Sequence, residues 1–360
     1  MNSAQNYSRL DRVLYHVAFR GVGVQKALAD IEDRLFLANH DYAPVKTPIF
    51  VTSLPRAGTT LLLEVLTAAP GLASHVYRDM PFVLCPLLWD RISRGVRRQS
   101  GLYERAHGDG MLVGYDSPEA FEEILWKAFW PQKYLSDRIT PWTQHDRSEE
   151  FEEFFHNHIR KIIALRPGGQ RYVSKNNANI ARVDLLYRIF PDSTIIIPVR
   201  NPLPHSESLL RQHLHFSNVH AQDKFGLRYM EWLGHHEFGA TLRPIDFDLW
   251  LENSHVQMPD TLDFWLTYWV AAYEYILSHV TPNVVFVDYD GLCADPLHGL
   301  GALANSLKIN DDAVLLEQAS RFRGPTCYEK RQDSSLDELV SKANELYKRL
   351  RVRSLQHINS

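Results

Sequence analysis

Residues 48–66 read PIFVTSLPRAGTTLLLEVL, and this stretch decides the fold. The apolar run 48–52 predicts a short strand, and the run that begins at Thr59 predicts a helix that Pro70 and Gly71 end. A glycine-containing loop joins the two. The unpaired N–H groups and the positive dipole end of such a helix start make a site for a phosphate group.

The loop departs from the motif that binds nucleoside triphosphates, in which glycine, four residues and a second glycine precede lysine and then serine or threonine. In the register 53–60, Ser53 stands in place of the first glycine and Thr59 in place of the lysine. Because that lysine reaches the γ-phosphate, we expect a ligand with one 5′-phosphate rather than ATP. Taken alone, the segment is equally compatible with an ordinary tight turn.

The rest of the chain continues the alternation of strand and helix. Apolar or β-branched runs predict strands at 171–175, 194–197 and 284–288, and apolar spacing predicts helices at 10–37, 179–190, 261–280 and 336–355. Fully apolar runs are typical of parallel strands that helices cover on both faces. The sequence therefore predicts an α/β fold of three α/β/α layers with a central parallel sheet and mainly helical insertions.

The composition is that of an ordinary globular protein, with 45% hydrophobic and 23% charged residues in a chain of 360. A formal net charge of −4 gives no overall electrostatic reason to bind nucleic acid. Three widely separated cysteines fit neither a disulfide framework nor a compact metal site, which favours a reducing, cytoplasmic location. We also expect no signal peptide and no membrane span, because Pro81 and Pro86 interrupt the longest apolar run.

Two blocks together carry a family resemblance. Residues 55–62, PRAGTTLL, resemble the PRSGTTLL phosphosulfate loop of the sulfotransferase superfamily, with Ala57 in place of serine. Residues 195–202, IIIPVRNP, followed by Ser208, resemble the family's strand that ends in Arg, then Asp or Asn, then Pro. The bacterial and tyrosylprotein-like branch is the most similar. A third segment, 287–296, resembles a family stretch that marks the fold.

This resemblance implies a P-loop-type enzyme that transfers a sulfuryl group from 3′-phosphoadenosine 5′-phosphosulfate (PAPS) to a hydroxyl acceptor and needs no metal. Arg200 and Ser208 would bind the 3′-phosphate, for which a planar guanidinium is well suited. Lys175 and Arg56 would stabilise charge on the departing oxygen. The implied binding residues for the rest of the donor are Arg56, Ala57, Gly58, Thr59 and Thr60.

A base for the acceptor hydroxyl is expected shortly after the loop helix. Asp79 is our first candidate, because in this branch a carboxylate stands shortly before a proline and an aromatic residue. His75 is the alternative, because its ordinary pKa is close to neutral pH. Structural roles for both residues stay open.

We interpret the chain as one domain, 1–360, with a helical N-terminal extension (1–46), a core (47–300) and a C-terminal helical segment (301–360). Residues 205–260 have weak periodicity and predict an insertion over the acceptor site, where His235 and His236 serve in polar packing or acceptor contact. The spacing of the histidines in this insertion matches no compact zinc-binding pattern. An aromatic set, Trp126, Trp130, Tyr134 and Trp142, either lines an acceptor pocket or packs in the core.

The acceptor class stays open among glycans, glycolipids, and small alcohols or phenols. Two other functions compete with sulfuryl transfer. A P-loop nucleotide kinase would bind ATP with Mg²⁺, against which the absent loop lysine argues. A non-catalytic nucleotide-binding protein would bind adenosine 3′,5′-bisphosphate without turnover.

Overall fold

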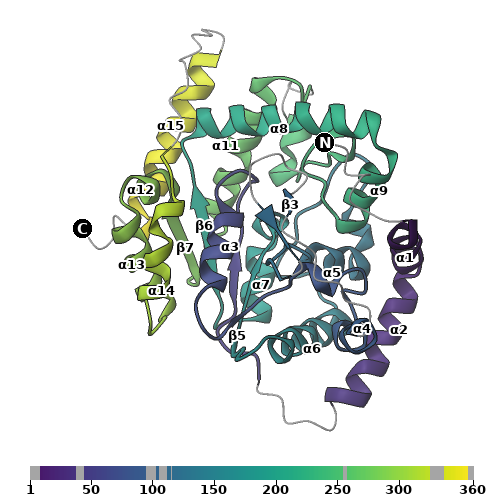
Figure 1. Cartoon of the computed structure of the whole chain (residues 1–360). Coiled ribbons are helices and arrows are strands. Elements are labelled where there is room, and N and C mark those ends of the chain that lie inside the picture. The colour runs from purple at the N-terminus through teal and green to yellow at the C-terminus, as the bar shows by residue number, and fades with distance from the viewer. Residues whose placement is uncertain are drawn as a thin grey trace.

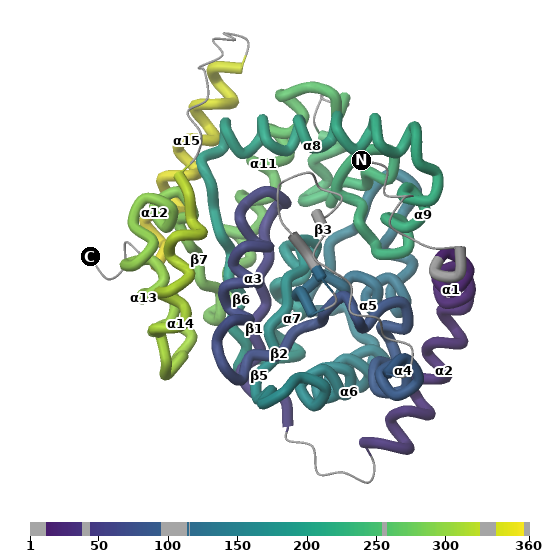
Figure 2. The backbone as a smooth tube through the Cα atoms, viewed as in Figure 1, coloured from purple at the N-terminus to yellow at the C-terminus, as the bar shows by residue number. Residues whose placement is uncertain are grey.

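A central sheet of parallel strands organises the protein. The computed structural model describes residues 9–37, 44–94, 103–104, 112–114, 116–253, 258–324 and 336–355. The sheet has the order β2-β5-β1-β6-β7, and every neighbouring pair is parallel. Figure 2 shows β1 between β5 and β6. The strands are β1 (Ile49–Val51), β2 (Leu72–Ala73), β5 (Arg171–Lys175), β6 (Thr194–Val199) and β7 (Val284–Asp288). A separate antiparallel pair is formed by β3 (Tyr103–Glu104) and β4 (Leu112–Val113).

Helices make up most of the remaining described chain (Figure 1). Those that precede β5 are α1 (Arg9–Arg20), α2 (Val22–Glu32), α3 (Thr59–Thr67), α4 (Pro86–Ser93), α5 (Glu122–Phe129) and α6 (Glu149–Leu165). Those that follow are α7 (Val183–Ile189), α8 (Pro202–Gln222), α9 (Lys224–Leu233), α10 (Trp250–Asn253), α11 (Leu262–Ser278), α12 (Tyr289–Ala294), α13 (Pro296–Leu307), α14 (Ala313–Leu316) and α15 (Asp337–Val352).

The sheet is buried on both faces, because its alternate side chains enter two different hydrophobic cores. In β1, Phe50 packs into the core with α6, α7 and α11, whereas Ile49 and Val51 pack into the core with α3 and α13. The same alternation holds in β6, where Ile195 and Ile197 face one core and Ile196 the other. In Figure 1, α13 and α14 lie on one side of the sheet and α6 on the other. The predicted three-layer α/β fold is therefore confirmed.

The parallel topology places the carboxyl ends of all five strands at one edge. This edge carries the loop after β1, Lys175 at the end of β5, and Arg200 directly after β6. Strand β2, which follows β1 in the chain, lies on one side of β1 in the strand order, and β6 lies on the other side. In open α/β sheets, ligands bind in the crevice outside the strand ends where the strand order reverses. The candidate site residues therefore meet where this fold ordinarily binds a ligand.

Several elements differ from the sequence predictions. The weak apolar periodicity from 205 onward did not predict a helix, but α8 runs without interruption to Gln222. Its buried residues include several histidines, and a pattern based on apolar residues does not register them. The helix predicted at 179–190 begins as a 3-10 helix, η5 (Asn177–Ala181), in which the Asn176 side chain accepts a hydrogen bond from Ala178 N–H.

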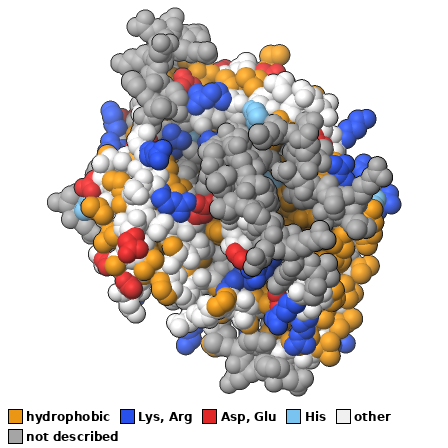
Figure 3. Space-filling view, viewed as in Figure 1, with side chains coloured by type: hydrophobic (Ala, Val, Ile, Leu, Met, Phe, Trp, Pro, Cys, Tyr) orange, Lys and Arg blue, Asp and Glu red, His pale blue; other side chains and the backbone are white. Residues whose placement is uncertain are grey.

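Two surface features complete the fold. Within the described ranges, no helix combines the length and the apolar character that crossing a membrane requires. Figure 3 shows hydrophobic side chains over the edge that α1 and α2 form, and Val13, Val17, Val24 and Ile31 are exposed on these helices. Helices α1 and α2 thus leave part of their apolar surface uncovered.

Candidate active site

The loop between β1 and α3 requires glycine at position 58 for two reasons. Gly58 adopts a left-handed backbone with φ of 86° at the N-terminus of α3, a conformation that glycine reaches at little cost. A Cβ atom placed on Gly58 would also lie only 2.0 Å from Cε2 of Tyr289. The Tyr289 ring, from the start of α12, therefore packs directly against the loop backbone, beside the fully buried Ala57.

Two side chains hold the carbonyl groups of the loop. His205 Nε2 lies 2.7 Å from the carbonyl oxygen of Pro55, and Arg200 donates to the carbonyl oxygen of Arg56 at 2.6 Å. Trp269 Nε1–H donates to His205 Nδ1 at 3.2 Å, so the imidazole proton is on Nε2 and donates to Pro55. Burial, followed by the charge of Arg200, lowers the pKa of His205 to about 3 and keeps the ring neutral.

A basic cluster lies beside the loop. Arg56 Nε donates to Ser208 Oγ at 3.5 Å, and Arg200 contacts the same arginine through its carbonyl group. The Nε atom of Arg200 is buried and has no hydrogen-bond partner among the described residues. The structure therefore brings together the three residues that the sequence predicts for phosphate binding, and the guanidinium of Arg200 has an unpartnered N–H group.

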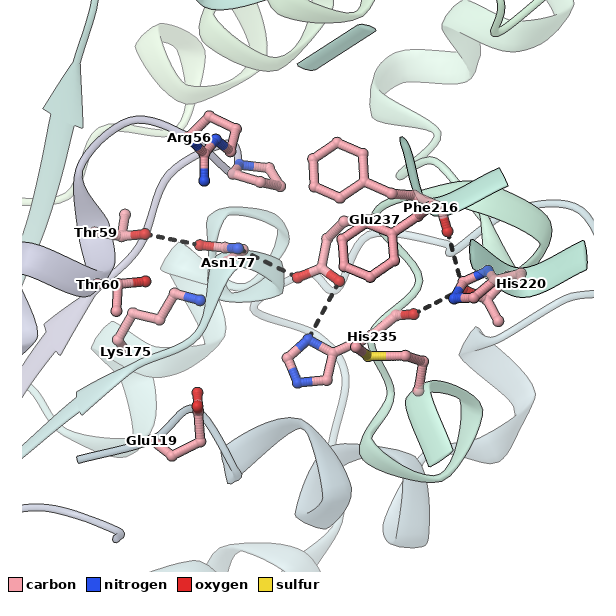
Figure 4. Close-up of a pocket in the computed structure, with 14 residues that line it drawn as sticks. Arg56, Thr59, Thr60, Glu119, Lys175, Asn177, Phe216, His220, His235 and Glu237 are labelled. Atoms are coloured by element: carbon pink, nitrogen blue, oxygen red, sulfur yellow. Dashed lines mark hydrogen bonds and ion pairs between the residues drawn. The ribbon is translucent and has the colours of Figure 1, made fainter. Parts of the chain in front are cut away.

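The first cavity opens against the loop (Figure 4). Thr59, Thr60 and Lys175 lie together on one side of it, with Arg56 beside them. Its other lining residues are Pro55, Glu119, Asn177, Phe216, His220, Met230, His235, Glu237, Phe238 and Thr241. Arg200 and Ser208 do not line this cavity but reach it through Arg56.

A chain of hydrogen bonds joins the loop to the segment after α9. Thr59 Oγ1 donates to Asn177 Oδ1 at 3.2 Å, and Asn177 Nδ2 donates to Glu237 Oε1 at 3.2 Å. On the other carboxylate oxygen of Glu237 lies His235 Nδ1, at 3.5 Å. Burial would raise the pKa of Glu237, but His235 and then Lys175 outweigh burial and hold it well below its ordinary value. Glu237 is therefore an ionised carboxylate that faces the cavity.

Glu119 is the second carboxylate of the first cavity. The Tyr77 hydroxyl donates to Glu119 Oε2, and the Ala120 N–H donates to Oε1 at 2.7 Å. Figure 4 shows it on the side of Lys175 away from Arg56.

A second cavity adjoins the first. Five residues line both cavities: Pro55, Lys175, Asn177, His235 and Glu237. Apolar side chains form most of the remaining lining, among them Leu54, Ile139, Leu242, Ile245 and Trp265. The site thus has a polar compartment at the loop and a mainly apolar compartment behind a shared polar wall.

The two predicted base residues lie outside both cavities. Asp79 is buried, forms an ion pair with Arg166 and accepts a hydrogen bond from Val76 N–H at 2.9 Å. Burial raises the pKa of this carboxyl group, and the charge of Arg166 opposes that shift. His75 is also buried, with Nε2 2.8 Å from Nε2 of His158, and burial lowers its pKa to about 3. Neither residue lines either cavity, although both follow the loop helix as predicted.

The histidines of α8 hold the backbone near the first cavity. His213 Nδ1 accepts a hydrogen bond from Gly239 N–H, and His220 Nδ1 accepts one from Ala240 N–H, each at 3.1 Å. In the part of the chain that is described, no three His, Cys, Asp or Glu side chains form a group that could hold a metal ion.

The aromatic set has a core role rather than a pocket role. Trp126 and Trp142 are fully buried and pack about the guanidinium of Arg182, 4.4 and 4.1 Å from the two ring centroids. None of the four aromatic residues lines either cavity. The interpretation of this set as helix-core packing is therefore the one that the structure supports.

The fold and the site define a class: a P-loop-like α/β protein with a glycine-containing loop at a helix N-terminus and no lysine in that loop. The model of the Sulfotransferase family matches residues 48–240, more than half of the chain. The protein belongs to this family, and the family assignment supports a sulfuryl-transfer activity.

Solved structures agree on the fold. Sulfotransferase STF1 from Mycobacterium tuberculosis H37Rv superposes with a TM-score of 0.50 at 16% identity, over 92% of this chain and 84% of that chain. Sulfotransferase STF9 from Mycobacterium avium gives a TM-score of 0.51 at 14% identity, over 88% of this chain and 81% of that chain. No curated protein sequence matches the chain.

Sequence reasoning assigned no role in the site to Glu119, Asn177 or Tyr289. Tyr289 belongs to a segment that we interpreted as a fold marker. Because its ring leaves no room for a Cβ atom at Gly58, Tyr289 has a second role beside the loop. Asn177 follows the Lys175 strand, where a polar turn was visible but its partners were not. Glu119 has no motif, so only the structure places it at the cavity.

Proposed function

We propose that the protein transfers a sulfuryl group from PAPS to a hydroxyl acceptor. The observation that carries this proposal is the convergence of the loop, Lys175 and the Arg56–Arg200–Ser208 cluster at one edge of the sheet. The 5′-phosphosulfate would lie against the loop and α3, and the 3′-phosphate would pair with Arg200 and Ser208. The buried, unpartnered Nε of Arg200 supports a second phosphate subsite, because an anion would supply its missing acceptor.

Sulfuryl transfer requires that the reactants be positioned and that developing charge be stabilised, and it requires no covalent intermediate with the protein. The acceptor oxygen attacks sulfur, and the electron pair of the breaking sulfur–oxygen bond remains on the phosphate of the leaving adenosine 3′,5′-bisphosphate. Lys175 and Arg56 line the cavity where that negative charge develops and would stabilise it. His205 and Arg200, by holding two loop carbonyl groups, would keep the loop backbone in its phosphate-binding conformation.

Two pairs of residues are candidates for the base that takes the proton of the acceptor hydroxyl. Asp79 and His75 stay as the proposals from the sequence, but a base must reach the acceptor hydroxyl directly or through one water. His235 and Glu237 meet this need better, because they lie 3.5 Å apart on the wall that both cavities share, and a neutral His235 ring can accept a proton. In this dyad Glu237 would hold the proton on His235 Nδ1, and Nε2 would take the proton of the acceptor.

A ligand-binding measurement tests the donor. Adenosine 3′,5′-bisphosphate should raise the thermal midpoint of unfolding more than ADP with Mg²⁺ does, because it carries the phosphate that the arginine cluster would bind. Ser208→Ala should reduce the advantage of the bisphosphate over AMP while AMP itself binds as before. A larger shift with ADP and Mg²⁺ would instead favour the kinase.

A second measurement tests the base with labelled PAPS and a hydroxyl acceptor. Glu237→Gln and His235→Asn should each lower turnover by about 10²-fold or more, the usual worth of a positioned base, and leave bisphosphate binding intact. Asp79→Asn is the matched variant outside the cavities, and it should lower turnover only in proportion to any loss of folded protein. Loss of turnover in folded Asp79→Asn, with activity retained in His235→Asn, would return the role to Asp79.

A further inference from the structure

The second cavity has the features of a binding site for an apolar molecule. It lies behind the wall formed by Lys175, Asn177 and Glu237, and apolar side chains such as Leu242, Ile245 and Trp265 line most of the rest. A glycan would leave many hydroxyl groups without partners in such a lining, so the cavity favours a compact apolar body.

One buried polar atom in this lining has no partner. His236 is 3% exposed and lines the second cavity, and its Nε2 atom makes no hydrogen bond with any described residue. Its Nδ1 atom lies 3.1 Å from the carbonyl oxygen of Thr241, so Nδ1 carries the proton and Nε2 has a free lone pair. Burial, and then the charges of Lys127 and Arg243, lower the pKa of His236 to about 4, which keeps the ring neutral near pH 7.

A buried acceptor of this kind requires a hydrogen-bond donor. Buried polar atoms in proteins almost always have a partner, and leaving one unpaired costs free energy. A ligand with an N–H or O–H group would supply the missing partner at His236. A site built to hydrogen-bond such a group also rejects analogues that lack it more strongly than an apolar pocket can.

We propose that the second cavity binds the acceptor, and that the acceptor is an apolar alcohol or phenol with a second O–H or N–H donor, which His236 Nε2 accepts. This inference rests on the proposed sulfuryl transfer, which places the reacting hydroxyl at the shared wall near Lys175. His236 is then a specificity-determining residue. It selects among acceptors and takes no part in the chemical step.

Matched pairs of acceptors test this assignment. The probes are two-ring phenols and alicyclic alcohols, each compared with the analogue in which a methyl ether or hydrogen replaces the second donor. Binding is measured by titration calorimetry with the protein saturated by adenosine 3′,5′-bisphosphate. The protein should bind the donor-bearing members at least tenfold more tightly than their partners.

Two substitutions at His236 separate recognition from folding. In His236→Asn, the side-chain amide can still donate to Thr241 but presents no acceptor at the Nε2 position. The two members of each pair should therefore bind with about equal affinity. In His236→Gln, an amide oxygen reaches that position and should restore part of the preference. Leu242→Val, in the same lining, is the control and should change affinity for both members alike.

The outcomes distinguish this inference from the proposed function. If adenosine 3′,5′-bisphosphate fails to bind, the sulfotransferase proposal itself is wrong. If the bisphosphate binds but both members of every pair bind equally, or if only sugars or tyrosyl peptides bind, the inference about His236 is overturned alone. Unchanged selectivity in His236→Asn would overturn it as well.

Discussion

The substitution Gly58→Ala tests whether the loop conformation depends on the contact with Tyr289. A non-glycine residue in the left-handed region costs roughly 1–2 kcal/mol. The new methyl group would also lie 2.0 Å from Cε2 and 2.4 Å from Cζ of the Tyr289 ring, far inside van der Waals contact. Overpacking of this kind costs about 1–3 kcal/mol, so the variant should lose about 2–5 kcal/mol of unfolding free energy.

A double-mutant cycle separates the two costs. Tyr289→Ala removes the three atoms that the new methyl group would approach most closely, so the double variant should keep mainly the backbone cost. The two substitutions should therefore be non-additive. The double variant should be about 1–3 kcal/mol more stable than the sum of the two single losses predicts.

The assay is urea unfolding of the four proteins, followed by adenosine 3′,5′-bisphosphate titration. Gly58→Ala should weaken bisphosphate binding, and removal of the ring should recover part of it. Additivity within about 0.5 kcal/mol would refute the reasoning, because independent sites add to within this error. It would mean that the ring moves away freely and does not define the loop.

Three other predictions concern the same site and its buried histidines. His205→Phe should weaken bisphosphate binding about tenfold, the worth of one hydrogen bond to the Pro55 carbonyl group, and His205→Gln, whose amide can donate, should retain it; equal losses would contradict this role. Arg200→Met should reduce the bisphosphate preference over AMP by about tenfold or more, and an unchanged ratio by calorimetry would remove Arg200 from the 3′-phosphate. The pKa values of His75, His205 and His236 lie near 3, 3 and 4, below the unfolded value, so stability is fully present above about pH 6.5 and is lost as the pH falls. The three rings alone would remove about 3–4 kcal/mol between pH 6 and pH 5, partly offset by Glu32 and Asp79, whose pKa values are raised; urea midpoints that stay constant there would contradict it.

The parts of the fold that the sequence predicted are those that local patterns determine. Strands β5 and β7 begin and end where the sequence predicts them, and β7 is apolar up to Asp288, as is typical of a parallel strand that helices cover on both faces. The glycine-containing loop could also be predicted from the sequence, because glycine at position 58 and a helix start are both local properties. Arg200 and Ser208 lie against Arg56, because the ends of parallel strands share one edge.

The acceptor side could not be predicted, because no local pattern produces it. The second cavity combines Ala120, Lys175, His236 and Trp265, which come from four distant segments. Position after the loop helix led to Asp79, and proximity in sequence did not reveal that Arg166 would pair with it. His236 was recognised only as polar packing or acceptor contact, since its unpartnered Nε2 is a property of the packed structure.

Helix α8 connects the loop after β1 to the segment after α9. His205, His213 and His220 recur at intervals of eight and seven residues, which places them on one face of the helix. From that face His205 holds the phosphate loop, and the other two hold the turn at Gly239 and Ala240. Because Nδ1 of all three rings accepts a hydrogen bond, each ring must stay neutral for the contact to persist. We therefore expect α8 to fix the donor loop relative to the segment that carries Glu237 and His236, which a metal-binding role for these histidines would not require.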